Sequence, residues 1–203
     1  MIYGPGERAV LWVQGCTLAC KGCWNTTTWS KQGGMDASIP EILGLLQHEE
    51  GIDGLTILGG EPLQQPDAVL QLIRGVQAAG LNVVLYTGYE VDELNGSALA
   101  CARETDLLIS GRYVEELRST TLRWRGSTNQ TITSPTGRFN CSEIEEFGEA
   151  EFHIDEATGS VVALGYPDDA MLDAIGVTRG RTPVQPSHES LRRRLQVVRE
   201  DVP

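Results

Sequence analysis

Short apolar runs alternate with amphipathic stretches through the first two thirds of the chain. The apolar runs predict strands over residues 8–14, 54–58, 81–86 and 106–109. The amphipathic stretches between them predict helices that begin at Ile39 and span residues 66–79 and 91–103. This alternation is typical of an α/β fold with a parallel sheet, which is either open or bent into part of a barrel.

The buried faces of the first two helices follow from the same spacing. Pro40 fits the first turn of one helix, whose apolar face is expected to hold Ile42, Leu45 and Leu46. Gly80 ends the other helix, whose predicted buried stripe is Val69, Leu70, Leu72, Ile73 and Val76.

Beyond Phe139 the sequence becomes acidic and hairpin-like. Residues 150–154 and 161–164 are expected to pair around a turn at 155–159, followed by a short helix over 168–175 and a surface helix over 189–199. We therefore expect two parts, a core over residues 1–138 and an acidic hairpin extension with a C-terminal tail over residues 139–203.

The composition narrows the class of protein. A chain of 203 residues that is 40% hydrophobic is long enough for one domain with a modest appendage. A net charge of −12 disfavours a phosphate-binding surface, so nucleic acid is not an expected partner. The apolar runs are too short to cross a bilayer and the amino-terminal residues do not resemble a signal peptide, so a cytoplasmic location without membrane association is expected.

Three of the five cysteines, Cys16, Cys20 and Cys23, lie in one short loop. An odd and crowded set of this kind fits a reducing compartment better than a disulfide framework. Cubane iron–sulfur clusters and structural zinc both take four protein ligands, so three thiolates leave one coordination position for another molecule. The alternatives to an iron–sulfur cluster are a zinc site with a distant fourth ligand and a redox-sensing group of thiols.

Further motifs follow the other predicted strands. Gly59-Gly-Glu-Pro62 comes after the second strand, Tyr86-Thr-Gly-Tyr89 after the third and Ser110-Gly-Arg-Tyr113 after the fourth. The carboxyl ends of parallel strands meet at one edge of a sheet, so we expect these motifs to lie beside the cysteine loop.

The cysteine loop and Gly59–Pro62 together resemble the radical S-adenosylmethionine superfamily. Within it, residues 3–132 resemble the activating proteins of anaerobic ribonucleotide reductase, which are glycyl radical activases. The stretches that carry this resemblance are residues 3–16, 16–25, 59–62, 86–94 and 122–130, the last of them reading Leu-Arg-Trp-Arg-Gly-Ser-Thr-Asn-Gln.

The resemblance implies a fold, cofactors and site residues. The fold would be a small partial (β/α) barrel of the radical S-adenosylmethionine type, carrying a C-terminal hairpin and helix extension. Cys16, Cys20 and Cys23 would hold a 4Fe-4S cluster whose fourth iron binds S-adenosylmethionine. The residues expected along that cofactor are Gly59, Gly60, Glu61, Pro62, Thr87, Arg112 and Trp24. Glycines let the backbone approach a ligand ammonium group, and Glu61 or nearby carbonyls would accept its protons.

The resemblance also implies a reaction. Reductive cleavage of S-adenosylmethionine would give a 5′-deoxyadenosyl radical, which removes hydrogen from a glycine of a partner such as anaerobic ribonucleotide reductase. A flavodoxin- or ferredoxin-type protein would supply the electron. The alternative is a radical S-adenosylmethionine enzyme that modifies a peptide or small metabolite in a biosynthetic pathway, and a non-enzymatic iron–sulfur or zinc module is a third.

Two positions differ from much of that group of proteins. Ser110 stands where many glycyl radical activases have aspartate, and Gly22 stands where many superfamily members have an aromatic residue that lies over adenine. Trp24 is expected either to take the place of that aromatic residue or to pack beneath the cluster.

Overall fold

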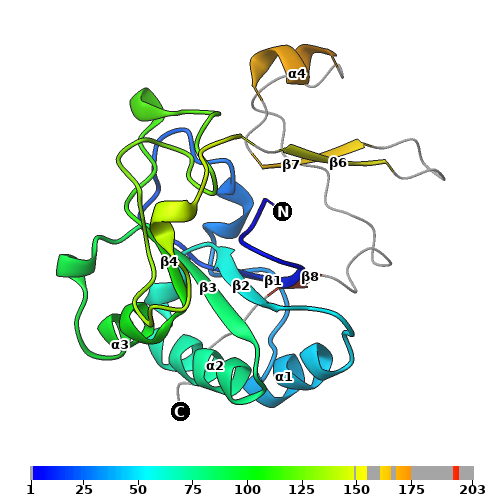
Figure 1. Ribbon diagram of the computed structural model, residues 1–203, viewed down its shortest axis with the longest axis vertical. Coiled ribbons are helices and arrows are strands. Elements are labelled where there is room, and N and C mark those ends of the chain that lie inside the picture. Colours follow the sequence, from blue (N-terminus) through cyan, green and yellow to red (C-terminus); the bar gives the residue numbers. More distant parts are fainter. Residues whose placement is uncertain (1, 149, 155–160, 166–167, 175–193, 197–203) are drawn as a thin grey trace.

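The chain forms an α/β structure in which helices cover one face of a six-stranded sheet (Figure 1). This computed structural model describes residues 2–148, 150–154, 161–165, 168–174 and 194–196. The sheet order is β5-β4-β3-β2-β1-β8. Its strands are β1 (Arg8–Val13), β2 (Gly54–Gly59), β3 (Asn82–Thr87), β4 (Leu107–Ser110), β5 (Thr131–Thr133) and β8 (Arg194–Gln196). The first four lie within one residue of the ranges predicted from the apolar runs.

Strands β1 to β4 are parallel neighbours in chain order, as the alternating pattern predicts. The helices that connect them are α1 (Ile39–Gln47), α2 (Pro66–Ala78) and α3 (Gly96–Glu104). Strand β5 pairs antiparallel with β4, and this short strand was not predicted from the sequence. The parallel arrangement brings the loops after β1, β2, β3 and β4 to one edge of the sheet.

The helix layer is built from the expected apolar faces, with one exception. Helix α1 begins at a capping box, in which Ser38 Oγ accepts from Glu41 N and Glu41 Oε2 accepts from Ser38 N. Ile42 and Leu46 are buried, but Leu45 is 50% exposed, so its predicted burial was wrong. The spacing of α1 turns Leu43 rather than Leu45 toward the core, where it packs as a partly buried residue.

Helix α2 supplies most of the contact with the sheet. Four of its predicted stripe residues are fully buried and Leu70 is partly buried against the same core. They pack with Leu55, Ile57, Val83 and Leu85 of the two central strands. Those strands are buried on both faces, which explains why their sequences are continuous apolar runs.

The other face of the sheet is covered by chain without regular helices. Val84, Leu107 and Ile109 form a second core with Trp124, and Phe139 and Ile144 pack against it. The amino-terminal residues cover the neighbouring strands on this face. There Tyr3 accepts a hydrogen bond from Thr56 Oγ1 at 2.8 Å and its ring meets that of Trp12 edge-on.

One predicted helix begins later than expected, and another is not found where the structure describes its residues. The helix over residues 91–103 is a 3-10 turn, Val91–Glu93, followed by α3, because Asn95 is extended and Gly96 adopts a φ of +49°. The Asn-Gly pair favours a turn over a continuous helix. Of the surface helix predicted over 189–199, residues 194–196 form β8 instead, parallel to β1. An edge strand has unpaired backbone groups, which this pairing satisfies on the outer side of β1.

The predicted hairpin of the extension is confirmed where the structure describes it. Strands β6 (Ala150–Ile154) and β7 (Val161–Gly165) pair antiparallel, and α4 (Asp169–Ala174) matches the short helix expected next. The turn between β6 and β7 lies outside the described residues. Within the described chain, every helix is too short or too polar to cross a bilayer.

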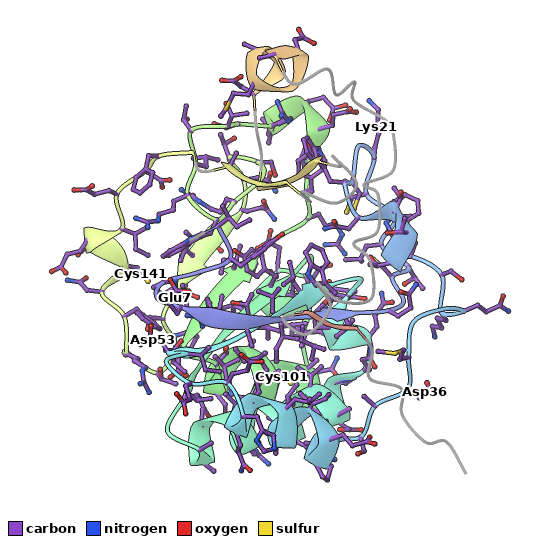
Figure 2. All side chains as sticks on the ribbon, turned by 90° about the vertical axis from the view of Figure 1, so that its right-hand side faces the viewer. Glu7, Lys21, Asp36, Asp53, Cys101 and Cys141 are labelled. Carbon is purple, nitrogen blue, oxygen red and sulfur yellow. The ribbon has the colours of Figure 1, made fainter. Side chains whose placement is uncertain are left out.

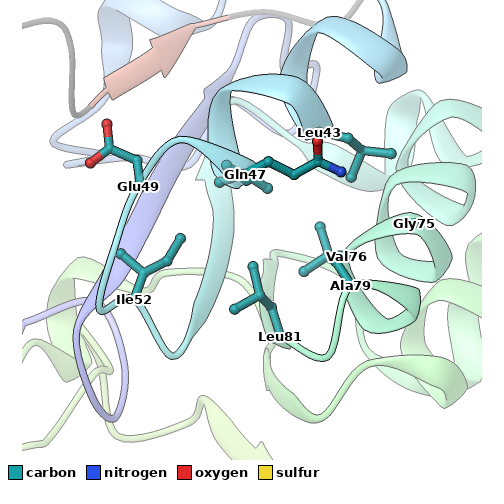
Figure 3. Close-up of a pocket in the computed structure, with 9 residues that line it drawn as sticks. Leu43, Gln47, Glu49, Ile52, Gly75, Val76, Ala79 and Leu81 are labelled. Carbon is teal, nitrogen blue, oxygen red and sulfur yellow. The ribbon is translucent and has the colours of Figure 1, made fainter.

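Figure 3 shows a small, mainly apolar hollow where the ends of α1 and α2 meet. Leu43, Ile52, Val76 and Leu81 are among its lining residues. It lies at the amino ends of β2 and β3, opposite the edge where the predicted site motifs gather.

Two helix glycines offer a test of this packing. A Cβ at Gly44 would contact nothing within 4 Å, whereas a Cβ at Gly75 would lie 2.6 Å from Leu43 Cδ1. We expect Gly44→Ala to raise the free energy of unfolding by about 0.5–1 kcal/mol through helix propensity, measured by urea unfolding. We expect Gly75→Ala to gain less, because Leu43 must leave its rotamer.

The background variant Leu43→Ala serves as the control for this comparison. Gly75→Ala made in that background should recover the gain seen at Gly44, because the side chain it meets has been removed. Equal gains at the two glycines in the wild-type background would contradict the packing described.

Candidate iron–sulfur site

The loop that carries Cys16, Cys20 and Cys23 begins directly after β1 and is held by the loops of the next three strands. Gly15, with a φ of +101°, turns the chain out of the strand, as expected for a residue at this bend. Gly15 N donates to Thr28 O at 2.8 Å and Cys16 N donates to Trp29 O at 3.0 Å, which closes the loop on itself.

The double glycine after β2 lies against the backbone of this loop. Gly60 N donates to Val13 O and Glu61 N donates to Gly15 O, both at 2.8 Å. A Cβ at Gly60 would lie 2.3 Å from Gly15 O, and one at Gly59 would lie 2.6 Å from Val13 N. Glycine is therefore required here by the close approach of two backbones next to Cys16.

Glu61 is buried and joins the loops after β2 and β3. Its Oε1 accepts from Leu63 N at 2.9 Å and from Thr87 Oγ1 at 2.8 Å, and its Oε2 accepts from Gly88 N at 2.8 Å. Burial raises the pKa of the Glu61 carboxyl, and these hydrogen bonds partly offset the shift. The carboxyl oxygens thus hold the loops after β2 and β3 together.

Thr87 and Pro62 are buried with Glu61. The Thr87 hydroxyl donates to Glu61 and accepts from Tyr89 N at 3.1 Å, so it fixes the turn after β3. Pro62 opens the 3-10 turn Pro62–Gln64, which Glu61 caps. The turn after β3 also reaches the cysteine loop, since a Cβ at Gly88 would lie 2.5 Å from Leu18 Cδ1.

Gln64 is a loop-holding residue that the sequence reasoning missed. Its Oε1 accepts from Thr17 N at 3.1 Å, and its Nε2 donates to Thr17 Oγ1 at 2.7 Å and to Tyr89 OH at 3.1 Å. The amide therefore spans the loops after β1 and β3. A glutamine two residues beyond a proline carries no sequence signal for that contact, which depends on the folded arrangement.

Backbone N–H groups lie near all three cysteine sulfurs. Those of Leu18 and Ala19 lie at Cys16, that of Tyr113 lies at Cys20, and Asn25 N donates to Cys23 Sγ at 3.4 Å. Burial raises the pKa of the Cys16 and Cys20 thiols, and repulsion between the neighbouring thiolates raises it further. Hydrogen bonds to sulfur are among the factors that set the reduction potential of an iron–sulfur cluster.

The donor set fits a 4Fe-4S cluster. The three partly exposed thiols share one loop, and cationic iron would relieve the repulsion between their thiolates. Within the part of the chain that the structure describes, no three His, Cys, Asp or Glu side chains surround a single metal-sized point. Cubane ligands each bind a different iron and need not converge in that way, unlike the ligands of zinc.

The loop after β4 covers the third side of the cysteine loop. Gly22 has a φ of +75°, a backbone conformation that favours glycine, and a Cβ there would lie 2.8 Å from Cδ of the Glu115 side chain. Lys21 pairs with Glu115 at 3.3 Å and with Glu116 at 3.0 Å. Ser110 is buried, and its hydroxyl lies 2.9 Å from that of Thr131 on the neighbouring strand.

Arg112 and Trp24 lie at the exposed side of this arrangement. Both terminal nitrogens of Arg112 donate to Glu93, at 2.6 and 2.8 Å, and its guanidinium lies 5.6 Å from the centre of the Tyr89 ring. This pairing lowers the pKa of Glu93 to about 2. The guanidinium of Arg118 lies 5.6 Å from the centre of the Trp24 ring.

The two other cysteines lie away from the loop, as expected of isolated thiols. Cys101 is buried in α3 and its Sγ donates to Pro66 O at 3.3 Å. Figure 2 shows Lys21 of the cysteine loop near one end of the molecule, opposite the helix layer that holds Cys101. Cys141 is partly buried against the second core.

Comparison with known proteins identifies the family. A family described as a 4Fe-4S single cluster domain matches residues 2–133. Anaerobic ribonucleoside-triphosphate reductase-activating proteins from Salmonella typhi and Vibrio cholerae are 33% and 37% identical to the chain, with 91% and 90% of their lengths covered. That of Enterobacteria phage T4 is 35% identical, with 88% covered. These alignments span 65–66% of this chain.

The chain belongs to the family of anaerobic ribonucleoside-triphosphate reductase-activating proteins. This membership confirms the recognition made from the sequence and the expected class of enzyme, a radical S-adenosylmethionine activase. It also confirms that residues 2–133 form a 4Fe-4S domain.

The raised pKa of Glu61 predicts a pH-dependent stability. The native state keeps a proton at pH values where the unfolded chain, near the ordinary value of 4.5, has lost it. The contribution of Glu61 to stability is therefore complete below that value and is lost as the pH rises through the native pKa. Glu61→Gln cannot ionise and lacks this dependence.

We expect the difference in free energy of unfolding, wild type minus Glu61→Gln, to fall as the pH rises above the ordinary glutamate value of 4.5 and through the raised native pKa. Urea unfolding of the iron-free proteins measures it. Glu50→Gln, at an exposed position, is the matched control and should parallel the wild type. A Glu61→Gln profile that also runs parallel would show that Glu61 is ionised in the native state throughout this range.

Proposed function

We propose that this protein binds a 4Fe-4S cluster through Cys16, Cys20 and Cys23 and activates a glycyl radical partner, most plainly an anaerobic ribonucleotide reductase. The supporting observation is the loop that carries these cysteines, which is held by the loops after β2, β3 and β4 in a chain of the activating-protein family. When bound, the cluster would supply the electron that cleaves S-adenosylmethionine to the 5′-deoxyadenosyl radical.

The protein's own residues would position these groups. In this proposal Gly59, Gly60 and Pro62 present backbone groups to S-adenosylmethionine. The hydrogen bond of 2.8 Å between Thr87 and Glu61 holds that backbone in place. Arg112 offers a cation to a ligand carboxylate, in competition with Glu93. Trp24 offers an aromatic surface at the exposed side.

We further propose that the parallel strands β1 to β4 with α1 to α3 are the partial (β/α) barrel of the radical S-adenosylmethionine enzymes. Support comes from the gathering of all four loops at the carboxyl ends of these strands. In this proposal the exposed side of the site admits a glycine-bearing loop of the partner protein. A flavodoxin- or ferredoxin-type donor would provide electrons.

Removal of single cysteines tests the cluster. After anaerobic reconstitution with iron and sulfide, we expect about four irons per wild-type chain and a strong loss of bound iron and of the visible absorption in Cys16→Ala, Cys20→Ala and Cys23→Ala. Cys141→Ser is the matched control because this thiol lies outside the loop, and it should retain the cluster. Full cluster loading in a loop variant would refute the assigned ligands.

Product analysis tests the reaction. Reduced, reconstituted protein given S-adenosylmethionine should release 5′-deoxyadenosine, and addition of a purified anaerobic ribonucleotide reductase should give a glycyl radical signal in electron paramagnetic resonance. Cys20→Ala should give neither. If 5′-deoxyadenosine forms but no glycyl radical appears on the reductase, the reductase is not the partner. A peptide or small metabolite would then be favoured as the hydrogen donor.

A further inference from the structure

The segment just beyond the family match packs on the Trp-Arg-Gly-Ser-Thr-Asn-Gln stretch of residues 124–130. Glu146 Oε2 accepts from Arg123 N at 2.9 Å, and Glu146 Oε1 pairs with the guanidinium of Arg125. The guanidinium of Arg123 lies 4.3 Å from the ring centre of Phe147 and 4.7 Å from that of Trp124. Residues after position 133, where the family match ends, thus contact the family's own residues.

Glu146 binds on both sides of a strained residue. Trp124 is buried and has a φ of +58°, in the left-handed region that a bulky side chain seldom adopts. Such a conformation persists only where surrounding contacts enforce it. The two groups that Glu146 binds, Arg123 N and the Arg125 guanidinium, come from the residues immediately before and after Trp124.

Residues 125–130 in turn hold the loop after β4. Arg125 Nη1 donates to Gln130 O at 3.2 Å, and Gln130 Nε2 donates to Gly111 O at 2.9 Å. Asn129 Nδ2 donates to Arg112 O at 2.8 Å. Next to these anchored residues, the backbone N–H of Tyr113 lies at the Cys20 thiol.

We propose that Glu146 is a positioning residue for the cysteine loop. By fixing the turn at Trp124, it holds residues 111–130 in the arrangement that places Tyr113 at Cys20 and Glu115 against Gly22. The segment that follows the family match is then a working part of the site, and this inference rests on the proposed function in that the cysteine loop binds the cluster.

The experiment compares Glu146→Gln with two matched controls. Glu145→Gln removes the neighbouring carboxylate, and Glu104→Gln breaks the exposed ion pair with Arg74 between α2 and α3. Hydrogen exchange is followed by mass spectrometry on the iron-free proteins. Alkylation of Cys20 by iodoacetamide is followed in the same samples, with Cys101 as the internal reference.

We expect Glu146→Gln to raise hydrogen exchange across residues 111–130 by about tenfold. We expect the alkylation of Cys20 to increase several-fold, with both controls unchanged. In reconstituted and reduced protein, the electron paramagnetic resonance signal of the cluster should shift in Glu146→Gln alone, because the backbone beside the ligand Cys20 has moved.

Two results would overturn the proposal. If exchange became faster only in residues 119–126 and 142–148 and Cys20 alkylation were unchanged, Glu146 would make only a local ion pair and would not position the cysteine loop. If Glu146→Gln and Glu145→Gln gave the same hydrogen exchange and the same Cys20 alkylation, Glu146 would have no effect on the cysteine loop. Both measurements use protein without iron, so they stay informative even if the proposed activation of a reductase fails.

Discussion

The approach of two backbones at Gly15 and Gly60 is the constraint on which the rest of the site depends. A Cβ at position 60 would lie 2.3 Å from the carbonyl oxygen of Gly15. The loops after β1 and β2 can therefore approach this closely only because position 60 has no side chain. That contact fixes the direction in which the chain leaves β1 and hence where Cys16 begins its loop. The Glu61 hydrogen bonds to Thr87 and Gly88 then extend the same constraint to the third strand.

Much of this architecture could be predicted from the sequence because it depends on local patterns. Central strands buried on both faces appear as continuous apolar runs, and α1 and α2 carry proline in their first turns. The helix predicted over residues 91–103 begins only at Gly96, because the turn at Asn95-Gly96 separates it from residues 91–93. The pairing of residues 194–196 with β1 depends on an edge elsewhere in the chain, so local patterns could not reveal it.

The roles of individual site residues were harder to predict than their location. The motifs at the ends of four strands do gather beside the cysteines. Sequence spacing could not show that the Glu61 carboxyl faces neighbouring loops, or that Gln64 spans two of them, since both contacts join strands that are distant in the chain. The contact between Gly22 and Glu115 likewise joins residues that are more than ninety positions apart.

The hydrogen bonds that close the cysteine loop have a consequence for substitutions outside it. Gln64 forms two hydrogen bonds with Thr17, and Gly15 N donates to Thr28 O. The positions of the thiols therefore depend in part on residues that are not cysteines. A substitution at Thr17 or Gln64 would loosen the spacing of the three sulfurs while leaving every sulfur in place.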